Sequence, residues 1–249
     1  MPQLSHGRAM DWLAERDPDR LAVVCEAEDR TAPAETRTRS ELVARANRLA
    51  RAWAALGVGR GDRVTIALPN GCEFFEAALA AWKLGATPNP VSARLPAAEQ
   101  RAIVETASPA VVLGADPEVC GGRPALPAGF EPDPAIDDGP LPDVVSPHVR
   151  AMTSGGSTGR PKVIIDANPA LCDPERPENR MKPNGRLLAP GPLYHAGPFI
   201  TSWQALLCGG TTWVQRRFDP LRCLECIERE AIDWVLFVPT MMQRIWKLP

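Results

Sequence analysis

The stretch "TSGGSTGRPK", residues 153–162, places three glycines and four hydroxyl residues directly before an arginine, a proline and a lysine. Glycine and serine are common in surface turns, so a flexible loop is the simplest interpretation. The same composition also suits a cradle for phosphate oxygens, in which amides and hydroxyls donate hydrogen bonds and a lysine adds positive charge. The chain has four lysines against 24 arginines, which favours a specific role for Lys162.

Composition excludes several classes of protein. The 249 residues are 45% hydrophobic and 23% charged, with a net charge of -2, so the basic field typical of nucleic-acid binding is missing. The opening residues are charged too early for a secretory signal, and the longest strongly apolar run, "WVLFV" at 234–238, is too short to span a membrane. We expect a cytoplasmic protein that binds no nucleic acid and has no membrane span.

The seven cysteines are scattered and odd in number, which argues against a disulfide framework and for a reducing compartment. Cys223 and Cys226 form a C-x-x-C within a segment whose apolar positions follow helical spacing. A redox or zinc site would need partners that the sequence does not offer nearby. We therefore expect two small buried residues, and no metal site.

Helical and strand periods alternate along the first half of the chain. Helices are expected at 40–57, with Ser40 as cap, at 71–85 and at 96–107, and short apolar strands at 62–68 and 109–113. This alternation predicts an α/β fold with layered, mostly parallel sheets and flanking helices.

The pattern stops between residues 121 and 147, where seven prolines and several acidic residues show no period. We expect an N-terminal α/β subdomain at 1–120, a proline-rich connection at 121–147, and an incomplete α/β region at 148–249. In that last region, 166–185 is too rich in proline for one regular helix. Regular elements return after it, including the strand "TTWVQ" and a helix at 220–231.

Two common phosphate-loop templates fail. The Walker pattern requires Gly-Lys followed by Ser or Thr, whereas Arg160 and Pro161 separate Gly159 from Lys162. The dinucleotide pattern G-x-G-x-x-G has a different glycine spacing. The stretch instead resembles the phosphate loop of the adenylate-forming superfamily, which includes acyl-CoA synthetases and luciferases. The matching residues are Ser154, Gly155, Gly156, Ser157, Thr158, Gly159, Pro161 and Lys162.

A second stretch, "PLYHAGPF" at 192–199, resembles the next signature of that family. By this resemblance Tyr194 and His195 line an acyl pocket, with Thr240 or Met241, where "VPTM" leads into a helix, on the opposite wall. His195 would lie near the reacting carboxylate without acting as a base. Arg217 falls where some members contact the phosphates of CoA, although a solvated surface arginine is the simpler interpretation.

The resemblance covers most of the chain and implies the fold of the N-terminal subdomains of adenylate-forming enzymes. It also implies ATP, Mg²⁺ and CoA as cofactor and co-substrates, and a small-molecule carboxylate as substrate. The sequences of the two motifs most resemble those of the branch that acts on bile-acid-like and other bulky carboxylates. The departures are a missing helix after Lys162, and the lack of a "YGxTE"-like stretch, a ribose-binding aspartate motif and a C-terminal lid domain with its lysine.

Two hypotheses from different classes follow. The first is the N-terminal portion of an AMP-forming acyl-CoA ligase, inactive alone, whose truncated face is covered by a homo-oligomer or another partner. The second is a non-catalytic truncated paralogue that acts as a binding or interaction module. A small-molecule kinase is disfavoured by the failed Walker match.

Overall fold

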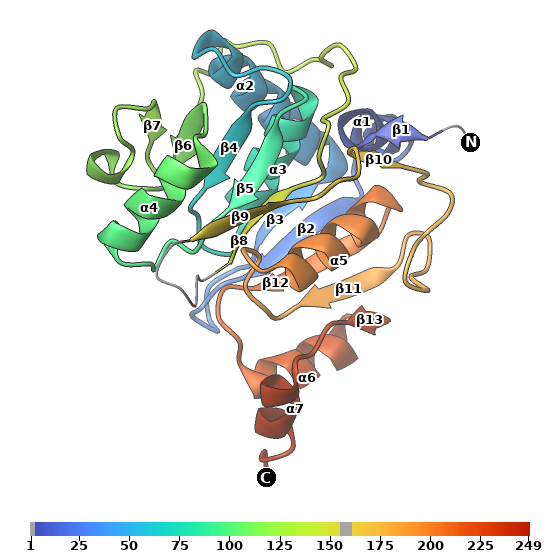
Figure 1. Cartoon of the computed structure of the whole chain (residues 1–249). Helices are drawn as coiled ribbons and strands as arrows, with labels where there is room; N and C mark the ends of the chain where they lie inside the picture. The colour runs from blue at the N-terminus through green and yellow to red at the C-terminus, as the bar shows by residue number, and fades with distance from the viewer. Residues whose placement is uncertain (1–2, 155–160) are drawn as a thin grey trace.

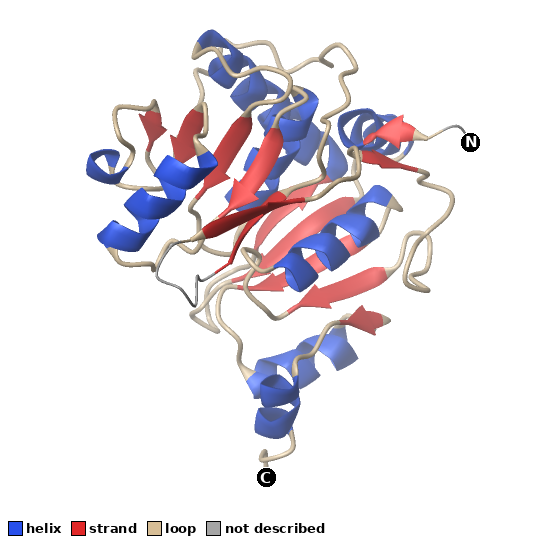
Figure 2. Ribbon diagram, in the orientation of Figure 1, coloured by secondary structure: helices blue, strands red, loops and turns tan. Residues whose placement is uncertain are grey.

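The computed structural model describes residues 3–154 and 161–249. Within them the chain forms two larger sheets, with strand orders β5-β4-β6-β7 and β13-β11-β12-β2-β3 (Figure 1). Strands β2 and β3 pair antiparallel, and the other neighbouring strands of these two sheets pair parallel. Figure 2 shows helices around and between the sheets. The α/β class expected from the sequence is confirmed.

The four-stranded sheet belongs to the first half of the chain. Its strands are β4 (Arg63–Ile66), β5 (Thr87–Pro90), β6 (Val111–Leu113) and β7 (Ala125–Leu126). The helices of this half are α1 (His6–Arg16), α2 (Arg39–Ala55), α3 (Cys72–Lys83), α4 (Ala97–Ala107) and the short 3-10 helix η1 (Pro117–Val119).

Helix α2 begins at Arg39, and its cap is Thr38, two residues before the predicted cap Ser40. Thr38 accepts a hydrogen bond from the Glu41 amide, while the Glu41 carboxylate accepts one from the Thr38 amide. This reciprocal pair satisfies two amides that the first turn leaves free, which is why it sets the helix start. Gly57, with φ +92°, takes a positive-φ conformation just beyond the helix, which favours glycine there.

The five-stranded sheet joins both ends of the chain. Strand β2 (Leu21–Glu26) pairs with β3 (Glu35–Thr38) on one side and with β12 (Thr211–Gln215) on the other. The sequence prediction had assigned none of α1, β2 and β3. The remaining elements of this part are β11 (Arg186–Ala189), α5 (Ala196–Leu207), α6 (Pro220–Arg229), β13 (Trp234–Val235) and α7 (Pro239–Ile245).

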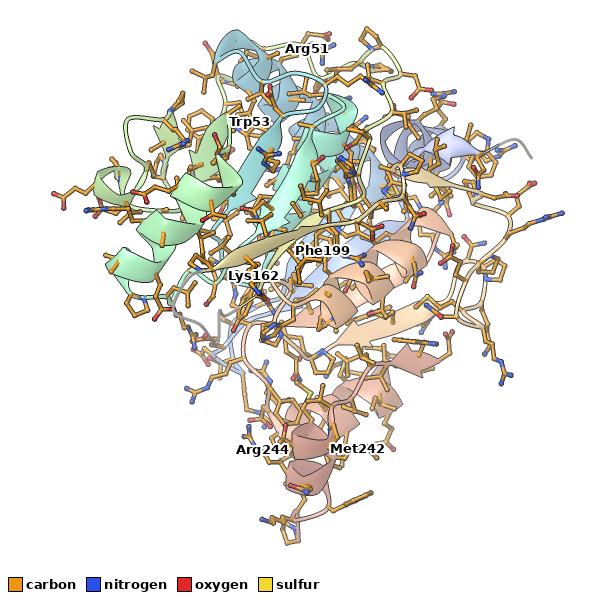
Figure 3. The ribbon with its side chains drawn as sticks, in the orientation of Figure 1. Arg51, Trp53, Lys162, Phe199, Met242 and Arg244 are labelled. Carbon is orange, nitrogen blue, oxygen red and sulfur yellow. The ribbon has the colours of Figure 1, made fainter. Side chains whose placement is uncertain are left out.

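Helix α3 packs between the two sheets and contacts strands of both. Eleven of its residues are buried, and Glu73 is the exception. A helix that is apolar on nearly every side is stable only in the interior, where all its apolar surface is shielded from water. Lys83, at its C-terminal end, is buried as well and forms an ion pair with Asp11 at 2.5 Å. Figure 3 shows Phe199 of α5 near the centre of the molecule, and Met242 and Arg244 of α7 near the C-terminus.

The proline-rich stretch 121–147 contains β7 and otherwise follows an irregular path along α2. Arginines of α2 hold it by ion pairs, Arg45 to Glu131 at 2.8 Å and Arg51 to Asp137 at 2.6 Å. The division at 120 and 147 stays a prediction. Strands from before and after this stretch share the five-stranded sheet.

Two short antiparallel strand pairs complete the fold. Strand β8 (Ala151–Ser154) pairs antiparallel with β9 (Lys162–Ile165), and β1 (Leu4–Ser5) pairs with β10 (Leu171–Cys172). Residues 166–185 contain β10 and no helix, as their prolines predicted.

Candidate active site

The two sequence motifs line one cavity of about 670 Å³. Thr153, Ser154 and Pro161 come from the ends of the β8–β9 pair, and Tyr194 and His195 from the turn before α5. This volume lies within the range of small-molecule sites, about 300–1,000 Å³. Residues far apart in the sequence therefore meet at a space large enough for a ligand.

The β8–β9 pair brings the first and last residues of the predicted phosphate loop together. Ser154 lies directly opposite Lys162 in the antiparallel register, and the Lys162 side chain is exposed. Strand β8 leads directly into the loop. Gly155, Gly156, Ser157, Thr158 and Gly159 lie outside the described residues, so their predicted phosphate contacts stay predictions.

A buried asparagine fixes β8 against the four-stranded sheet. The Asn89 side-chain amide, fully buried at the end of β5, donates to the Ala151 carbonyl at 2.6 Å. Its own carbonyl accepts a hydrogen bond from the Thr65 hydroxyl at 2.8 Å. Since buried amides without partners are costly, this pair of bonds defines where β8 begins relative to β5.

A second buried asparagine fixes the turn that carries Tyr194 and His195. Asn70 donates to the carbonyls of Gly191 and Gln215 and accepts from the Leu193 amide, each at 2.9 Å. The turn is thereby held against the end of β12. Neither asparagine was singled out from the sequence, and both position the motif residues.

His195 is the N-cap residue of α5 and is itself exposed. Its side chain makes no capping hydrogen bond, and its ring lies 4.4 Å from that of Tyr194, measured between ring centroids. The cavity therefore touches the N-terminal end of a twelve-residue helix. That end carries partial positive charge, which favours an anionic group nearby.

Helix α4 forms a wall of this cavity that the sequence analysis did not anticipate. Its lining residues include two alanines, a carboxylate and an apolar residue, namely Ala98, Ala102, Glu99 and Ile103. Leu95 and Val91 of the preceding segment extend the same wall. Small side chains on a helix leave room for a bulky ligand beside Tyr194.

Thr240 does not line this cavity. It lies in the first turn of α7 and is exposed, whereas its neighbour Met241 approaches the turn at Gly191. A Cβ placed on Gly191 would lie 3.6 Å from the Met241 Cε atom. The opposite-wall role of Thr240 stays a prediction.

Arg217 is exposed and lines two smaller cavities next to the first. One, of about 150 Å³, also touches Tyr194, and the other, of about 330 Å³, also touches Arg222 and Arg244. Tyr194 thus borders both the main cavity and the smallest one. The three spaces form a series that leads from His195 to a cavity lined by four arginines and three carboxylates.

Cys223 and Cys226 are buried on α6, as predicted. Burial raises the pKa of each thiol to about 12, so both stay protonated at neutral pH and are poor metal ligands. In the described part of the chain, no group of three His, Cys, Asp or Glu side chains is placed to hold a metal ion. Among the same residues, no helix is long and apolar enough to cross a bilayer.

A mostly parallel α/β scaffold that joins a Gly/Ser-rich phosphate motif to a Tyr-His turn defines an adenylate-forming type of protein. The chain belongs to the AMP-binding enzyme family, whose model matches residues 10–249.

Known proteins of this family resemble the chain over most of its length. It is 35% identical over 221 residues to feruloyl-CoA synthase of Amycolatopsis sp, covering 84% of this chain and 45% of that protein. Long-chain-fatty-acid–CoA ligase FadD13 of Mycobacterium tuberculosis is 25% identical, covering 85% of this chain and 46% of its own length. The N-terminal domain of FACL13 from Mycobacterium tuberculosis superposes with a TM-score of 0.75 at 24% identity, covering 99% of this chain and 66% of that one.

The chain spans about half the length of the curated relatives it matches. The names of these relatives specify a feruloyl and a long-chain fatty acyl group. They support membership of the CoA-ligase family and do not single out the bile-acid-like branch to which the motif wording pointed.

Proposed function

We propose that this chain forms the phosphate-binding and carboxylate-binding part of an AMP-forming acyl-CoA ligase. The shared cavity carries this proposal, because Ser154 at one end of the phosphate motif and the Tyr194–His195 pair line the same space. An acyl adenylate forms only where a triphosphate and a carboxylate meet, so the two motifs must face one another.

ATP, as its Mg²⁺ complex, is held by its β- and γ-phosphates at the β8–β9 pair. Lys162 supplies charge there, and Ser154 with residues 155–159 supplies donors. Each charge-assisted hydrogen bond contributes about 1.5–3 kcal/mol. Neutralising the two terminal phosphates stabilises pyrophosphate as a leaving group, which lowers the barrier to its departure.

The substrate carboxylate lies beside His195, at the N-terminal end of α5, where the helix dipole favours negative charge. One carboxylate oxygen attacks the α-phosphorus of ATP, the bond from that phosphorus to the bridging oxygen breaks, and pyrophosphate leaves. A carboxylate is already ionised at neutral pH, so His195 orients it and removes no proton.

The series of cavities from Tyr194 to Arg217 suits the approach of CoA. At its outer end the arginines, Arg217 and Arg244 among them, outnumber the carboxylates of Glu26, Glu28 and Asp219 by one, and CoA phosphates would bind there. The CoA thiolate then attacks the acyl carbonyl carbon of the adenylate and AMP leaves. The alanines of α4 favour a bulky, largely apolar acid as the substrate.

Exposed apolar side chains on α6, on α7 and at the C-cap of α7 fit the subunit or partner contact expected from the sequence. They include Leu224, Met242 and Trp246, the last with 73% of its surface exposed. Residues 1–249 alone should bind ATP weakly and should not turn over at enzyme rates, because immobilising the nucleotide costs several kcal/mol against a few loop contacts.

The test measures ATP·Mg²⁺ binding to residues 1–249 by ³¹P NMR and calorimetry. Lys162→Ala should weaken binding by about tenfold or more, since a charge-assisted contact is lost. Lys247→Ala removes another exposed lysine, outside the cavity, and should leave the affinity unchanged. Equal affinity in both variants would remove the phosphate-site assignment.

Carboxylate-dependent ATP–pyrophosphate exchange, with ferulate, palmitate and a steroid acid as probes, tests the chemistry. We expect no exchange at rates normal for an enzyme. Exchange abolished by Lys162→Ala would show that the chain is active by itself. Failure to bind ATP or any of these acids would favour the non-catalytic binding module.

A further inference from the structure

The smallest of the three neighbouring cavities, about 150 Å³, is lined by three arginines and by no carboxylate of any described residue. The arginines are Arg94, Arg216 and Arg217, and we call this space the arginine cavity. The cavity of about 330 Å³ beside it is different, since three carboxylates accompany its four arginines. Positive charge without a carboxylate in the lining is therefore specific to the smallest space of the series.

The arginine cavity lies where strands of both large sheets end. Asn70 and Ser92 come just after β4 and β5 of the four-stranded sheet. Pro190 and Arg216 come directly after β11 and β12 of the five-stranded sheet. In α/β proteins, ligands bind at the carboxyl ends of parallel strands. The arginine cavity is therefore at a place where this class of fold binds ligands.

Hydrogen bonds fix the backbone that carries two of the arginines. The Asn70 side chain donates to the carbonyl of Gln215, the residue directly before Arg216, at 2.9 Å. The Arg94 amide donates to the Ser92 hydroxyl at 3.3 Å, in the turn that follows β5. Binding costs less free energy when the binding groups are already in place.

The charge of this lining is only partly compensated. Arg216 pairs with Glu35 at 2.9 Å, and Glu35 lines an adjoining cavity of about 440 Å³ and not this one. Glu28 borders both adjoining cavities and is also absent from this lining. Arg94 and Arg217 have no ion-pair partner among the residues that the structure describes. Both are exposed, so a dissolved anion can reach them.

The proposed path of CoA does not account for this charge. The arm of CoA between its phosphates and its thiol is uncharged, so guanidinium groups give it no electrostatic stabilisation. Unpaired guanidinium groups that line one small space repel each other, and an oxyanion between them removes that repulsion. Arginine also binds phosphate oxygens through pairs of N–H donors, which gives the attraction a direction.

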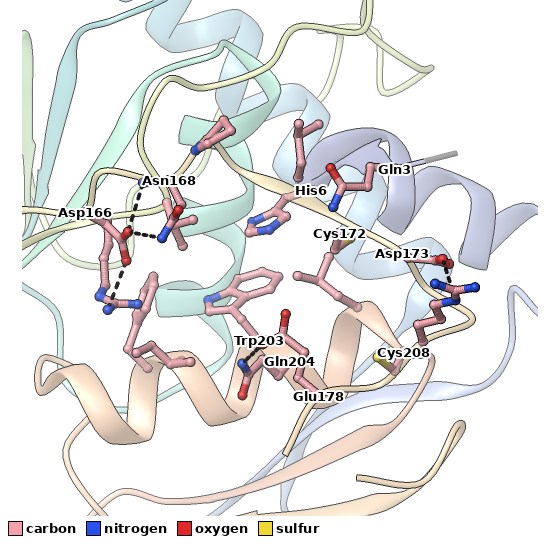
Figure 4. Close-up of a pocket in the computed structure, with 18 residues that line it drawn as sticks. Gln3, His6, Asp166, Asn168, Cys172, Asp173, Glu178, Trp203, Gln204 and Cys208 are labelled. Atoms are coloured by element: carbon pink, nitrogen blue, oxygen red, sulfur yellow. Dashed lines mark hydrogen bonds and ion pairs between the residues drawn. The ribbon is translucent and has the colours of Figure 1, made fainter. Parts of the chain in front are cut away.

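A cavity of about 580 Å³ along α5 provides a contrast (Figure 4). Each arginine of its lining pairs with an aspartate of the same lining, Arg150 with Asp166 at 3.0 Å and Arg176 with Asp173 at 3.7 Å. His6 adds no charge there, because burial lowers its pKa to about 3 and keeps the imidazole neutral. That lining has no positive charge in excess for an anion.

We propose that the arginine cavity binds one small phosphate-like oxyanion, held by Arg94 and Arg217, and that this anion keeps the CoA arm out of the path. The anion site depends on the lining alone, whereas the exclusion of CoA rests on the proposed function. Inorganic phosphate and the pyrophosphate released from ATP share this chemistry. Since the anion and the arm occupy the same small space, binding of either weakens binding of the other.

An NMR titration of the full 249-residue chain with inorganic phosphate at pH 7 tests the site. Lys162→Ala is present throughout, because the phosphate motif is a second proposed site for phosphate. We expect the Nε–H signals of Arg94 and Arg217 to shift together, with a dissociation constant of about 1 mM or below. Pyrophosphate in a parallel titration shows which of the two anions binds more tightly.

Three further variants locate the binding. Arg94→Gln changes an exposed side chain and should weaken phosphate binding at least about fivefold, since a charge-assisted contact is lost. Arg94→Lys keeps the charge without the paired donors, so its affinity should fall between those of Arg94 and Gln at this position. Arg101→Gln, at an exposed arginine of α4 outside the three cavities, is the matched control and should leave the affinity unchanged.

Competition with CoA tests the exclusion. Calorimetry on the same protein compares CoA binding in phosphate with CoA binding in chloride of equal ionic strength. At about 20 mM phosphate and a dissociation constant of about 1 mM, competition should lower the apparent CoA affinity about twentyfold. The difference between the two salts should shrink in Arg94→Gln. No CoA binding in chloride would remove the CoA path and the exclusion with it, and the phosphate titration would still decide the anion site.

Three results would overturn the anion site. They are no saturation by phosphate or pyrophosphate below about 10 mM, equal phosphate affinities of Arg94→Gln and Arg101→Gln, and NMR shifts confined to residues outside 92–94 and 215–217. Equal CoA affinities in phosphate and in chloride would overturn the exclusion. A loss of CoA affinity in Arg94→Gln without any loss of phosphate affinity would assign the arginine cavity to CoA instead.

Discussion

The N-terminal end and the middle of α5 differ in what surrounds them. At the N-terminal end, His195 is exposed at the cavity that both motifs line, and no side chain caps the helix. One turn later the Phe199 ring lies 6.1 Å from Phe74 and 5.9 Å from Trp82, between ring centroids, inside the main core. Trp203 follows, 4.6 Å from the Trp82 ring.

This difference separates the residues that stabilise the helix from those at the proposed ligand site. The aromatic residues of its middle hold α5 in place, and the exposed end is free to carry residues chosen for a ligand. Side chains at such an end can change without loss of the fold, because little apolar surface is buried there. The four predictions below test this separation, beginning with the largest effect.

Phe199→Ala should lower the free energy of unfolding by about 3–5 kcal/mol, since a fully buried phenyl ring is replaced by a cavity. Urea denaturation measures this change. Phe218→Ala, at a half-buried ring beside Arg244, is the matched control and should cost less than half as much. Similar losses at the two positions would contradict the assignment of the core to the middle of α5.

Asn70→Ala should cost about 2–4 kcal/mol, because three buried backbone groups lose their hydrogen-bond partner. The same substitution should disorder the turn before α5, visible as faster hydrogen exchange at the Leu193 amide. Asn168→Ala removes an exposed asparagine that bonds within its own turn and should cost under about 1 kcal/mol. An Asn70 variant as stable as the Asn168 variant would show that the turn keeps its conformation without the hydrogen bonds of Asn70.

Acid should destabilise the protein through His6. Its pKa is about 3 in the folded chain and 6.5 in the unfolded chain, so the unfolded state binds more protons between these values. Above pH 6.5 His6 is neutral in both states and does not change the free energy of unfolding. Below pH 6.5 it lowers that free energy by about 1.4 kcal/mol per pH unit, which amounts to about 2–3 kcal/mol by pH 4.5. His6→Gln should flatten this part of the stability–pH curve, and an unchanged slope would show that other groups produce it.

His195→Ala should change stability by less than about 0.5 kcal/mol, since the side chain is exposed and caps nothing. It should nevertheless weaken binding of ferulate in the presence of ATP by about three- to tenfold, which corresponds to one lost hydrogen bond. Denaturation and calorimetry on the same sample give both values. Large destabilisation without a change in ferulate affinity would reverse the roles assigned to the N-terminal end and the middle of α5.

Local patterns predicted most of the regular elements after residue 39. The strand expected at "TTWVQ" is β12, residue for residue, and the helix expected at 220–231 is α6 with a slightly earlier end. These elements are marked by periods and by caps such as Asp219, whose side chain accepts a hydrogen bond from the Arg222 amide. Periodicity and helix caps lie within a few residues of the helix or strand that they specify.

The sequence did not predict the features that depend on residues far away in the chain. Strand β2 was not assigned, although it lies next to β12 at the centre of the five-stranded sheet. Asn70 forms hydrogen bonds with residues more than 120 positions away, and no neighbouring residue in the sequence indicates that it holds the turn before α5. For the site, the motifs indicated Ser154, Tyr194 and His195, while the α4 wall depends on how the two sheets pack and has no local signature.

The pairing of β2 with β12 has a consequence for synthesis of the chain. Glu26 and Gln215 are partners across these strands and are 189 residues apart. At about 5–20 residues per second, the ribosome takes about 10–40 s to deliver β12 after β2 has emerged. During that interval β3 can cover one edge of β2, while the other edge, along "LAVVCE", has no strand to pair with. Nascent chains of this protein should therefore depend on ribosome-associated chaperones until residue 215 has left the exit tunnel.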